Sequence, residues 1–314
     1  MEAYREELAF ELVPGEERLV VEGEGVKLCA AVKNPPGAAR GTLFFLHGVA
    51  SNASRWEEFV ETTPLGADWR LLRYDLRLLR YDLRGHGASV TAEPPVIERH
   101  VADVLAVMDA AGVDRCVLVG HSLGGHIAMY ALAQHPERFE GAILLDPLVT
   151  EALTEKAEEF KRRRPLVRFL EICGRVANAV GLRRKLPHYS LRRHDEVARA
   201  MLAKGGVALE AFIREFSAPT KDLGHIHLAY YARDLLETGR PSPDLSGLQL
   251  PVLVVTSSAG SFTDPDRLAA WARRLPHGSA TSVQCLHWPM TECPDDVSRE
   301  MTRWLNAEFP KSNN

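Results

Sequence analysis

Short apolar runs recur along the chain and are separated by segments with a helical pattern. Nearly continuous hydrophobic stretches occupy residues 41–48, 115–122, 139–147, 250–257 and 280–287. Such runs are typical of strands that are buried on both faces of a parallel sheet. Helical patterns lie between them, as in ERHVADVLAVMDAAG and DPDRLAAWARRLP. Alternating strands and helices of this kind predict a doubly wound α/β domain.

Two parts of the chain depart from this alternation. The first forty residues predict antiparallel strands, because ELAFELV and RLVVEG flank the turn signal Pro14–Gly15 and VKLCAAVKN follows soon after. Residues 148–245 have a helical pattern without a convincing strand and end in a linker rich in proline, glycine and serine. We therefore expect an α/β core of residues 1–147 and 246–314, with residues 148–245 inserted as a helical cap.

A tandem duplication precedes one glycine-rich turn. The heptad LLRYDLR at residues 71–77 is repeated without change at residues 78–84. Seven residues is too short for a solenoid period, so one copy is expected to supply a strand and the other to lengthen the preceding connection. Because both copies present the same side chains, the register is ambiguous. We favour the second copy as the strand, since it leads directly into RGHGAS.

Composition and charge narrow the class of protein. The chain has 314 residues and a formal net charge of −4, which argues against a general nucleic-acid binder. Five scattered cysteines with no CxxC pattern indicate neither a disulfide framework nor a zinc site, and we expect no metal and no organic cofactor. The charged start has no signal-peptide core, and no apolar run is long enough to span a bilayer. A cytoplasmic location is the expectation.

The strongest chemical signal is VLVGHSLGGHIAMYALAQHP, in which Ser122 lies between a strand and a helix. Glycines two residues before and two after the serine suit a strained strand-to-helix turn, where a β-carbon would clash with neighbouring backbone. Such a turn raises the hydroxyl of Ser122 above the sheet edge, near a helix N-terminus that favours developing negative charge. Ser122 is the predicted nucleophile.

Two further segments supply the other groups that a serine nucleophile needs. In FLHGVASNASRW a strand ends at a glycine, and the backbone N–H of Val49 can bind an oxyanion together with the N–H of Leu123. In QCLHWPMTECPDDVSREMTRWL, His287 follows the last predicted strand. An imidazole there can accept the serine proton, since its pKa is close to neutrality. We interpret the other histidines as residues of turns, loops or the cap.

Four motifs together resemble the α/β-hydrolase family over most of the chain outside the cap. LHGVASNASRW, YDLRGHGAS, VGHSLGG and LHWPMTECPDDV match, in order, the family's oxyanion loop, the turn after its fourth strand, its nucleophile elbow and its histidine loop. The resemblance implies an eight-stranded, mostly parallel sheet with the strand order 1-2-4-3-5-6-7-8 and a cap inserted after strand six. It also implies a Ser-acid-His triad with Ser122 and His287 as nucleophile and base.

The acid of that triad is the open question. In much of the family it follows strand seven, but an ungapped comparison of PVLVVTSSAGSFTDPDRLAAW places Gly260 there. Asp264 lies four residues further on, although its place before Pro265 is that of a helix N-cap. Asp146 ends the run AILLDP, and haloalkane dehalogenases in the family place their acid after strand six. We favour Asp146, because a strand-end residue is held rigidly, and keep Asp264 as the alternative.

The expected protein is a serine hydrolase that cleaves an ester or thioester of a small to medium apolar acyl compound through an acyl-enzyme. A C–C bond hydrolase or a cofactor-free peroxidase with the same triad is one alternative. A binding protein that does not turn over its ligand is another, and Gly260 is the feature that favours it. The excess of arginine and lysine in the cap is explained most simply by a solvated helix face. An anionic substrate or an acidic carrier protein is the other explanation.

Overall fold

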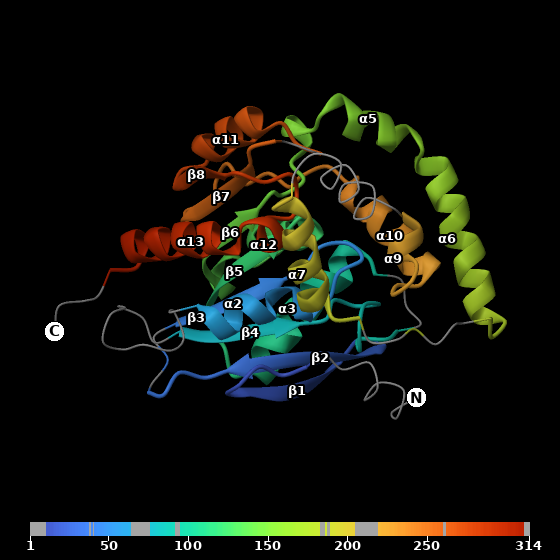
Figure 1. Cartoon of the computed structure of the whole chain (residues 1–314), viewed down its shortest axis with the longest axis horizontal. Helices are drawn as coiled ribbons and strands as arrows, with labels where there is room; N and C mark the ends of the chain where they lie inside the picture. The colour runs from blue at the N-terminus through green and yellow to red at the C-terminus, as the bar shows by residue number, and fades with distance from the viewer. Residues whose placement is uncertain are drawn as a thin grey trace.

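The apolar runs of the sequence form the strands of one twisted sheet (Figure 1). A computed structural model describes residues 11–37, 39, 41–63, 76–91, 95–182, 186, 189–204, 219–259 and 262–310. The strands are β1 (Glu16–Gly23), β2 (Val26–Lys33), β3 (Gly41–Leu46), β4 (Leu76–Tyr81), β5 (Cys116–His121), β6 (Phe139–Leu145), β7 (Val252–Ser257) and β8 (Gly278–Val283). Their order in the sheet is β1-β2-β4-β3-β5-β6-β7-β8, which confirms the predicted order.

The sheet is parallel from β4 to β8 and antiparallel at its start. β1 pairs with β2, and β2 with β4, in antiparallel register, whereas every later pair is parallel. Residues 11–13, which end the predicted strand ELAFELV, form no strand, and residues 7–10 lie outside the described residues. The remaining predicted strands are present within a few residues of their predicted bounds.

The duplicated heptad contributes to β4 from both copies. Leu76 and Arg77 close the first copy, and residues 78–81 of the second copy form the rest of the strand. The second copy therefore supplies most of the strand, as expected, and its Asp82 begins the turn that follows. Residues 71–75 lie outside the described residues.

Helices cover both faces of the sheet. Burial of their apolar faces builds two core clusters, one on each side, so the domain is doubly wound. The first face is covered by α3 (Ile97–Ala110), α4 (Leu123–Gln134) and α11 (Pro265–Arg274). The second face is covered by η1 (Ala53–Trp56), α2 (Glu57–Thr62) and α13 (Pro294–Glu308). Short helical turns are η3 (Pro136–Arg138), η4 (Thr150–Ala152) and α12 (Pro289–Glu292).

The chain between β6 and β7 forms helices joined by loops and contains no strand among its described residues. Its longer helices are α5 (Glu155–Arg162), α6 (Arg164–Ala179), α7 (Leu191–Leu202) and α10 (Leu228–Thr238), and α9 (Pro219–Asp222) is a single turn. In Figure 1 these helices lie beyond the carboxyl ends of the parallel strands, and α6 packs on α10 at the outer edge. Within the ranges given above, no helix is both long and apolar enough to cross a membrane.

Candidate active site

Ser122 occupies a strained turn between β5 and α4. Its φ of 51° and ψ of −114° lie outside the regions that most L-residues adopt. Two glycines make this turn sterically possible: a β-carbon at Gly120 would overlap the backbone of Gly124, and one at Gly124 would overlap the carbonyl oxygen of Leu46. The elbow is therefore pressed against the end of β3, which holds the serine at the carboxyl edge of the sheet.

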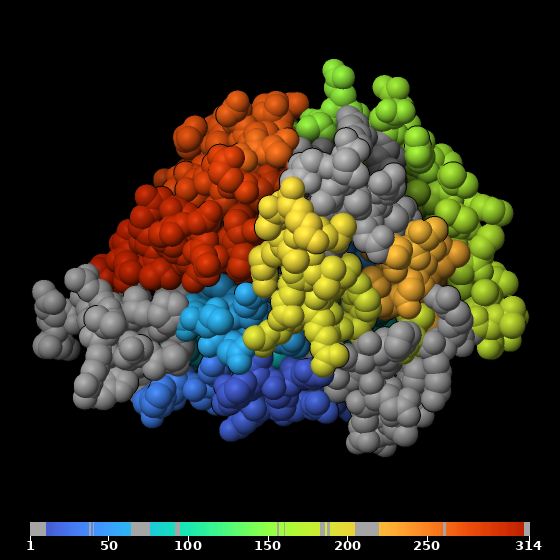
Figure 2. All heavy atoms as spheres, in the orientation of Figure 1, coloured from blue at the N-terminus to red at the C-terminus, as the bar shows by residue number. Residues whose placement is uncertain are grey.

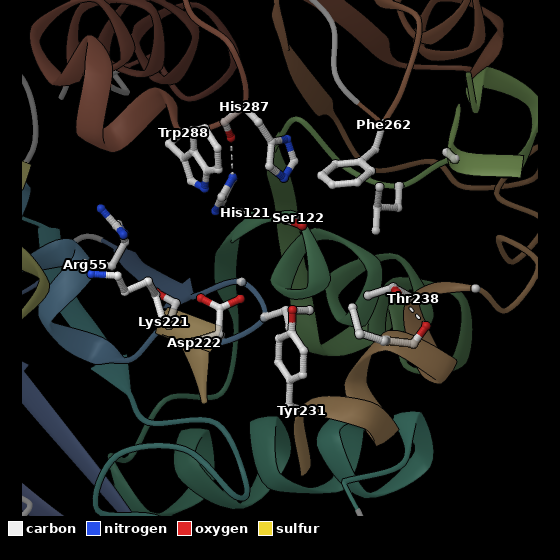
Figure 3. A pocket seen from close by; sticks show the side chains of 18 of the residues that line it. Arg55, His121, Ser122, Lys221, Asp222, Tyr231, Thr238, Phe262, His287 and Trp288 are labelled. Atoms are coloured by element: carbon white, nitrogen blue, oxygen red, sulfur yellow. Dashed lines mark hydrogen bonds between the residues drawn. The ribbon is translucent and has the colours of Figure 1, made fainter. Parts of the chain in front are cut away.

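His287 and Asp146 meet at this edge from opposite parts of the chain. Nδ1 of His287 contacts Oδ2 of Asp146, and both side chains are buried. Asp146 follows β6 with a φ of 44°, and Thr263 donates a hydrogen bond to its Oδ1 at 3.3 Å. A carboxylate only accepts hydrogen bonds, so the contact needs the proton on Nδ1 and leaves Nε2 free to accept another. Figure 3 shows the imidazole above Ser122.

The second candidate acid has a different role in the structure. Asp264 is the N-cap of α11, where its side chain accepts a hydrogen bond from the backbone N–H of Arg267 at 2.9 Å. Pro265 follows at the first helical position, as the sequence predicts. Of the two aspartates, Asp146 is the one in contact with His287. Gly260, the position at which an ungapped comparison placed the acid, lies outside the described residues.

The loop that carries His287 is fastened by two side chains that sequence reasoning did not single out. Glu292 of α12 accepts hydrogen bonds from the backbone N–H groups of Leu286, His287 and Trp288 at 2.9–3.2 Å. Nε2 of His121 donates to the carbonyl oxygen of His287 at 2.9 Å. Burial and the neighbouring His287 lower the pKa of His121 to about 3, so this side chain is a neutral donor. In the sequence, only the position of His121 next to Ser122 in GHSLG could have indicated this role.

A second loop, residues 48–51, faces the elbow and carries the predicted oxyanion donor Val49. A β-carbon at Gly48 would lie 3.4 Å from Cβ of Ser122, so the loop passes close to Ser122. His225, which precedes α10, hydrogen-bonds the carbonyl oxygen of Ala50 at 2.7 Å. Its ring stacks on Tyr189 with centroids 4.3 Å apart. Burial lowers the pKa of His225, so the neutral ring must place its proton on Nε2 to make this bond.

Ser122 and His287 open into one cavity of about 480 Å³. Its walls come from the sheet edge and from the helices between β6 and β7. Apolar side chains line part of it: Leu148, Leu153, Val167, Leu235, Leu236 and Phe262. Polar side chains line another part: Arg55, Tyr189, His194, Lys221, Asp222, His225 and Tyr231. In Figure 3, Phe262 lies to one side of His287, and Asp222 and Tyr231 lie below Ser122.

Charged groups of the polar part are partly desolvated. Burial raises the pKa of the Asp222 carboxyl to about 6, and a hydrogen bond from Tyr231 opposes that rise. Arg55 is buried and pairs with Asp195 and Thr291, which joins η1 to α7 and α12. Among the described residues, no group of three or more His, Cys, Asp or Glu side chains is arranged to hold a metal ion.

Residues 43–300 match the sequence profile of the alpha/beta hydrolase family. The chain belongs to this family. It is 32% identical to the human monoglyceride lipase over 299 residues, which cover 91% of this chain and 89% of that protein. It is 26% identical to ethanol acetyltransferase 1 of Kluyveromyces marxianus, over 71% of this chain and 64% of that protein. A thermophilic esterase from Thermogutta terrifontis has the same fold, with a TM-score of 0.62 and 21% identity, covering 93% and 99% of the two chains. This hydrolase thus has the same fold as an esterase, and its sequence is similar to that of a lipase over most of its length.

Proposed function

We propose that this hydrolase is a serine hydrolase that cleaves an ester or thioester of a small to medium apolar acyl compound through an acyl-enzyme. Ser122 is the nucleophile, His287 the base and Asp146 the acid. The observation that carries the proposal is the contact between His287 Nδ1 and Asp146 Oδ2 at the rim of the cavity that Ser122 also lines.

The reaction follows from these positions. Nε2 of His287 takes the hydroxyl proton as the oxygen of Ser122 attacks the carbonyl carbon, and Asp146 stabilises the imidazolium that forms. The N–H groups of Val49 and Leu123 bind the oxyanion. His287 then gives its proton to the leaving alcohol or thiol, and the acyl group stays on Ser122. A water molecule, deprotonated by His287, releases the acid and restores the serine.

The two parts of the cavity support an ester with one apolar and one polar half. Leucine and valine side chains from the segment after β6 and from α6 and α10 suit an aliphatic or aromatic acyl group. Asp222, Tyr231 and Lys221 can hydrogen-bond hydroxyl groups of the leaving alcohol. The relatives point the same way, since one is named as a lipase of monoglycerides and another as an acetyl transferase to ethanol. Both names describe acyl transfer involving an alcohol.

Labelling with a fluorophosphonate probe tests the nucleophile. We expect stoichiometric labelling of the wild-type protein and none of Ser122→Ala. Ser51 is a matched control, because it lines the same cavity and its buried hydroxyl has no hydrogen-bond partner among the described residues. Ser51→Ala should therefore still be labelled. Folded wild-type protein that resists the probe, or labelling that survives in Ser122→Ala, would refute the proposal.

Turnover of p-nitrophenyl esters tests the substrate class. kcat/KM should rise as the acyl chain lengthens from acetyl and should fall again once the apolar part of the cavity is filled. Thioesters of the same acids should follow the same order, because the acyl half is shared. An absence of turnover on every member of both series, in protein that the probe labels, would exclude ester and thioester cleavage while leaving Ser122 as a reactive nucleophile.

A further inference from the structure

Helix α6 presents an apolar face to solvent. Of eleven large hydrophobic side chains that are exposed in the described residues, seven lie between residues 166 and 182. They are Leu166, Phe169, Leu170, Ile172, Val176, Val180 and Leu182, with exposed fractions of 37–75%. Five of them recur at spacings of three, one, six and four residues, which places them on one side of the helix. We call these seven residues the α6 outer face.

A different side of α6 makes its contact with the rest of the protein. Val167, Glu171 and Gly174 are its buried residues, again spaced three or four apart. A β-carbon at Gly174 would lie 2.8 Å from the backbone nitrogen of Ala229, so α6 and α10 approach closely there. The packing requirement of the helix is therefore met by its inner side. Figures 1 and 2 show α6 at the edge of the molecule, outside α10.

Positive charge lies along one edge of the α6 outer face and at its N-terminal end. Arg162, Arg163, Arg164, Arg168 and Arg175 are exposed at or beside the helix, and Lys161 precedes them. The single acidic residue of α6 is Glu171, which is buried and neutralised by Arg233 at 3.1 Å and Arg175 at 3.6 Å. The nearest exposed acids on the chain belong to α5, on the other side of the basic block. A helix with one apolar side and a basic flank is typical of segments that lie in a membrane interface.

We propose that the α6 outer face docks this protein on an anionic lipid surface. The apolar side chains enter the acyl boundary, and the arginines pair with lipid phosphates and carboxylates. A second copy of the chain is a poorer occupant, because its α6 outer face has the same positive charge beside it and α6 offers no exposed acid to pair with the arginines. This inference concerns binding alone and does not rest on the proposed catalytic activity.

The same helix joins the docking surface to the cavity. Arg164 and Val167 of α6 line the cavity that holds Ser122, while Leu166 and Phe169 face away from the protein. A molecule dissolved in the lipid layer would therefore meet the protein within one helix diameter of its cavity, about 10 Å. Docking by α6 would place the cavity beside the lipid surface without any change in the fold.

Vesicle flotation tests the proposal directly. The full-length protein is mixed with vesicles of phosphatidylcholine, with and without phosphatidylserine, and the floating fraction is measured. We expect binding that rises with phosphatidylserine and falls with added salt. The double variant Phe169→Glu/Val176→Glu should lower the affinity by about tenfold or more, because two apolar anchors become anions. Arg168→Gln should weaken binding to the anionic vesicles only.

A matched control separates docking from a general effect of added charge. Val176 and Val197 are both valines on helices, and both are 58% exposed, but Val197 belongs to α7. Val197→Glu should therefore bind vesicles like the wild type. Thermal unfolding and turnover of a water-soluble p-nitrophenyl ester report whether each variant is folded, since none of these residues lines the cavity.

Three results would overturn the proposal. The first is a wild-type protein that floats with neither kind of vesicle. The second is an equal loss of binding in Val197→Glu and in the double variant. The third is a dimer in solution that Phe169→Glu/Val176→Glu dissociates without a change in vesicle binding, because the α6 outer face would then contact a second copy.

Discussion

The position of the acid can be tested by exchanging one oxygen of Asp146 for nitrogen. In Asp146→Asn the carbonyl oxygen is expected to keep the hydrogen bond from Thr263, since that hydroxyl donates to Oδ1 in the wild type. The amide NH₂ then replaces Oδ2 and faces Nδ1 of His287. An NH₂ group can only donate, so Nδ1 must give up its proton and Nε2 must carry it. The imidazole can then no longer accept the proton of Ser122.

The expected size of this effect is large. Loss of the correct tautomer in a serine triad lowers kcat by on the order of 10⁴. This corresponds to about 5 kcal/mol in the activation barrier. Burst kinetics with a p-nitrophenyl ester should show slower acylation in Asp146→Asn. The fluorophosphonate label should also form more slowly by a similar factor, because the same proton transfer activates Ser122.

Asp264→Ala is the matched control for this measurement. It removes the N-cap bond to Arg267, which should cost about 1 kcal/mol of folding free energy and leave kcat within about twofold. A second control is the double variant Asp146→Asn/Thr263→Val, in which the asparagine is free to turn its carbonyl oxygen toward His287. This double variant should recover part of the lost rate. Near-normal turnover in Asp146→Asn, or a larger loss in Asp264→Ala, would show that Asp146 is not the acid.

Three further variants test the supports of the site and the fold. His225→Ala should lower kcat about tenfold with little change in KM, because the loop that carries Val49 loses its hydrogen bond, and His225→Gln, which can still donate, should restore part of it. Asp234→Asn should reduce the unfolding free energy by about 3 kcal/mol at pH 5.5 in urea titrations, since Asp234 is buried 3.1 Å from His86. Burial lowers the pKa of His86, but the attraction of Asp234 outweighs burial and raises that pKa, while the pKa of Asp234 is lowered. The difference in unfolding free energy between the wild type and Asp234→Asn should therefore be largest from about pH 4 to 6.5 and should shrink as pH rises through the raised pKa of His86. A difference that grows above pH 8 would contradict the ion pair. Gly124→Ala should destabilise the protein by about 3 kcal/mol or prevent folding, whereas Gly247→Ala, with open space around it, should have the stability of the wild type.

Sequence reasoning reached the fold because the fold depends on local patterns. Buried parallel strands are continuous apolar runs, and each run lies within a few residues of its strand. The turn at Ser122 could be predicted equally well, because close contacts within the turn and with the end of β3 leave no room for a β-carbon at Gly120 or Gly124. The start of the sheet was less readable: residues 11–13 at the end of ELAFELV form no strand, and residues 7–10 lie outside the described residues. A short segment beside a sheet edge has few neighbours to enforce its pairing.

The partners of His287 were harder to predict because they are set by contacts between distant parts of the chain. Asp146 and Asp264 both precede a proline, and both lie between Ser122 and His287 in the sequence. What separates them is the place of Asp146 directly after β6 with a positive φ, against the N-cap position of Asp264, and the φ of Asp146 cannot be read from the sequence. The supporting histidines are harder still. His121 and His225 both bond backbone carbonyl oxygens, and every residue has a carbonyl oxygen, so no residue type marks such a partner. A histidine that acts as a base can be proposed from its place after a strand, whereas a histidine that positions a loop is found only when the loop has been placed in space.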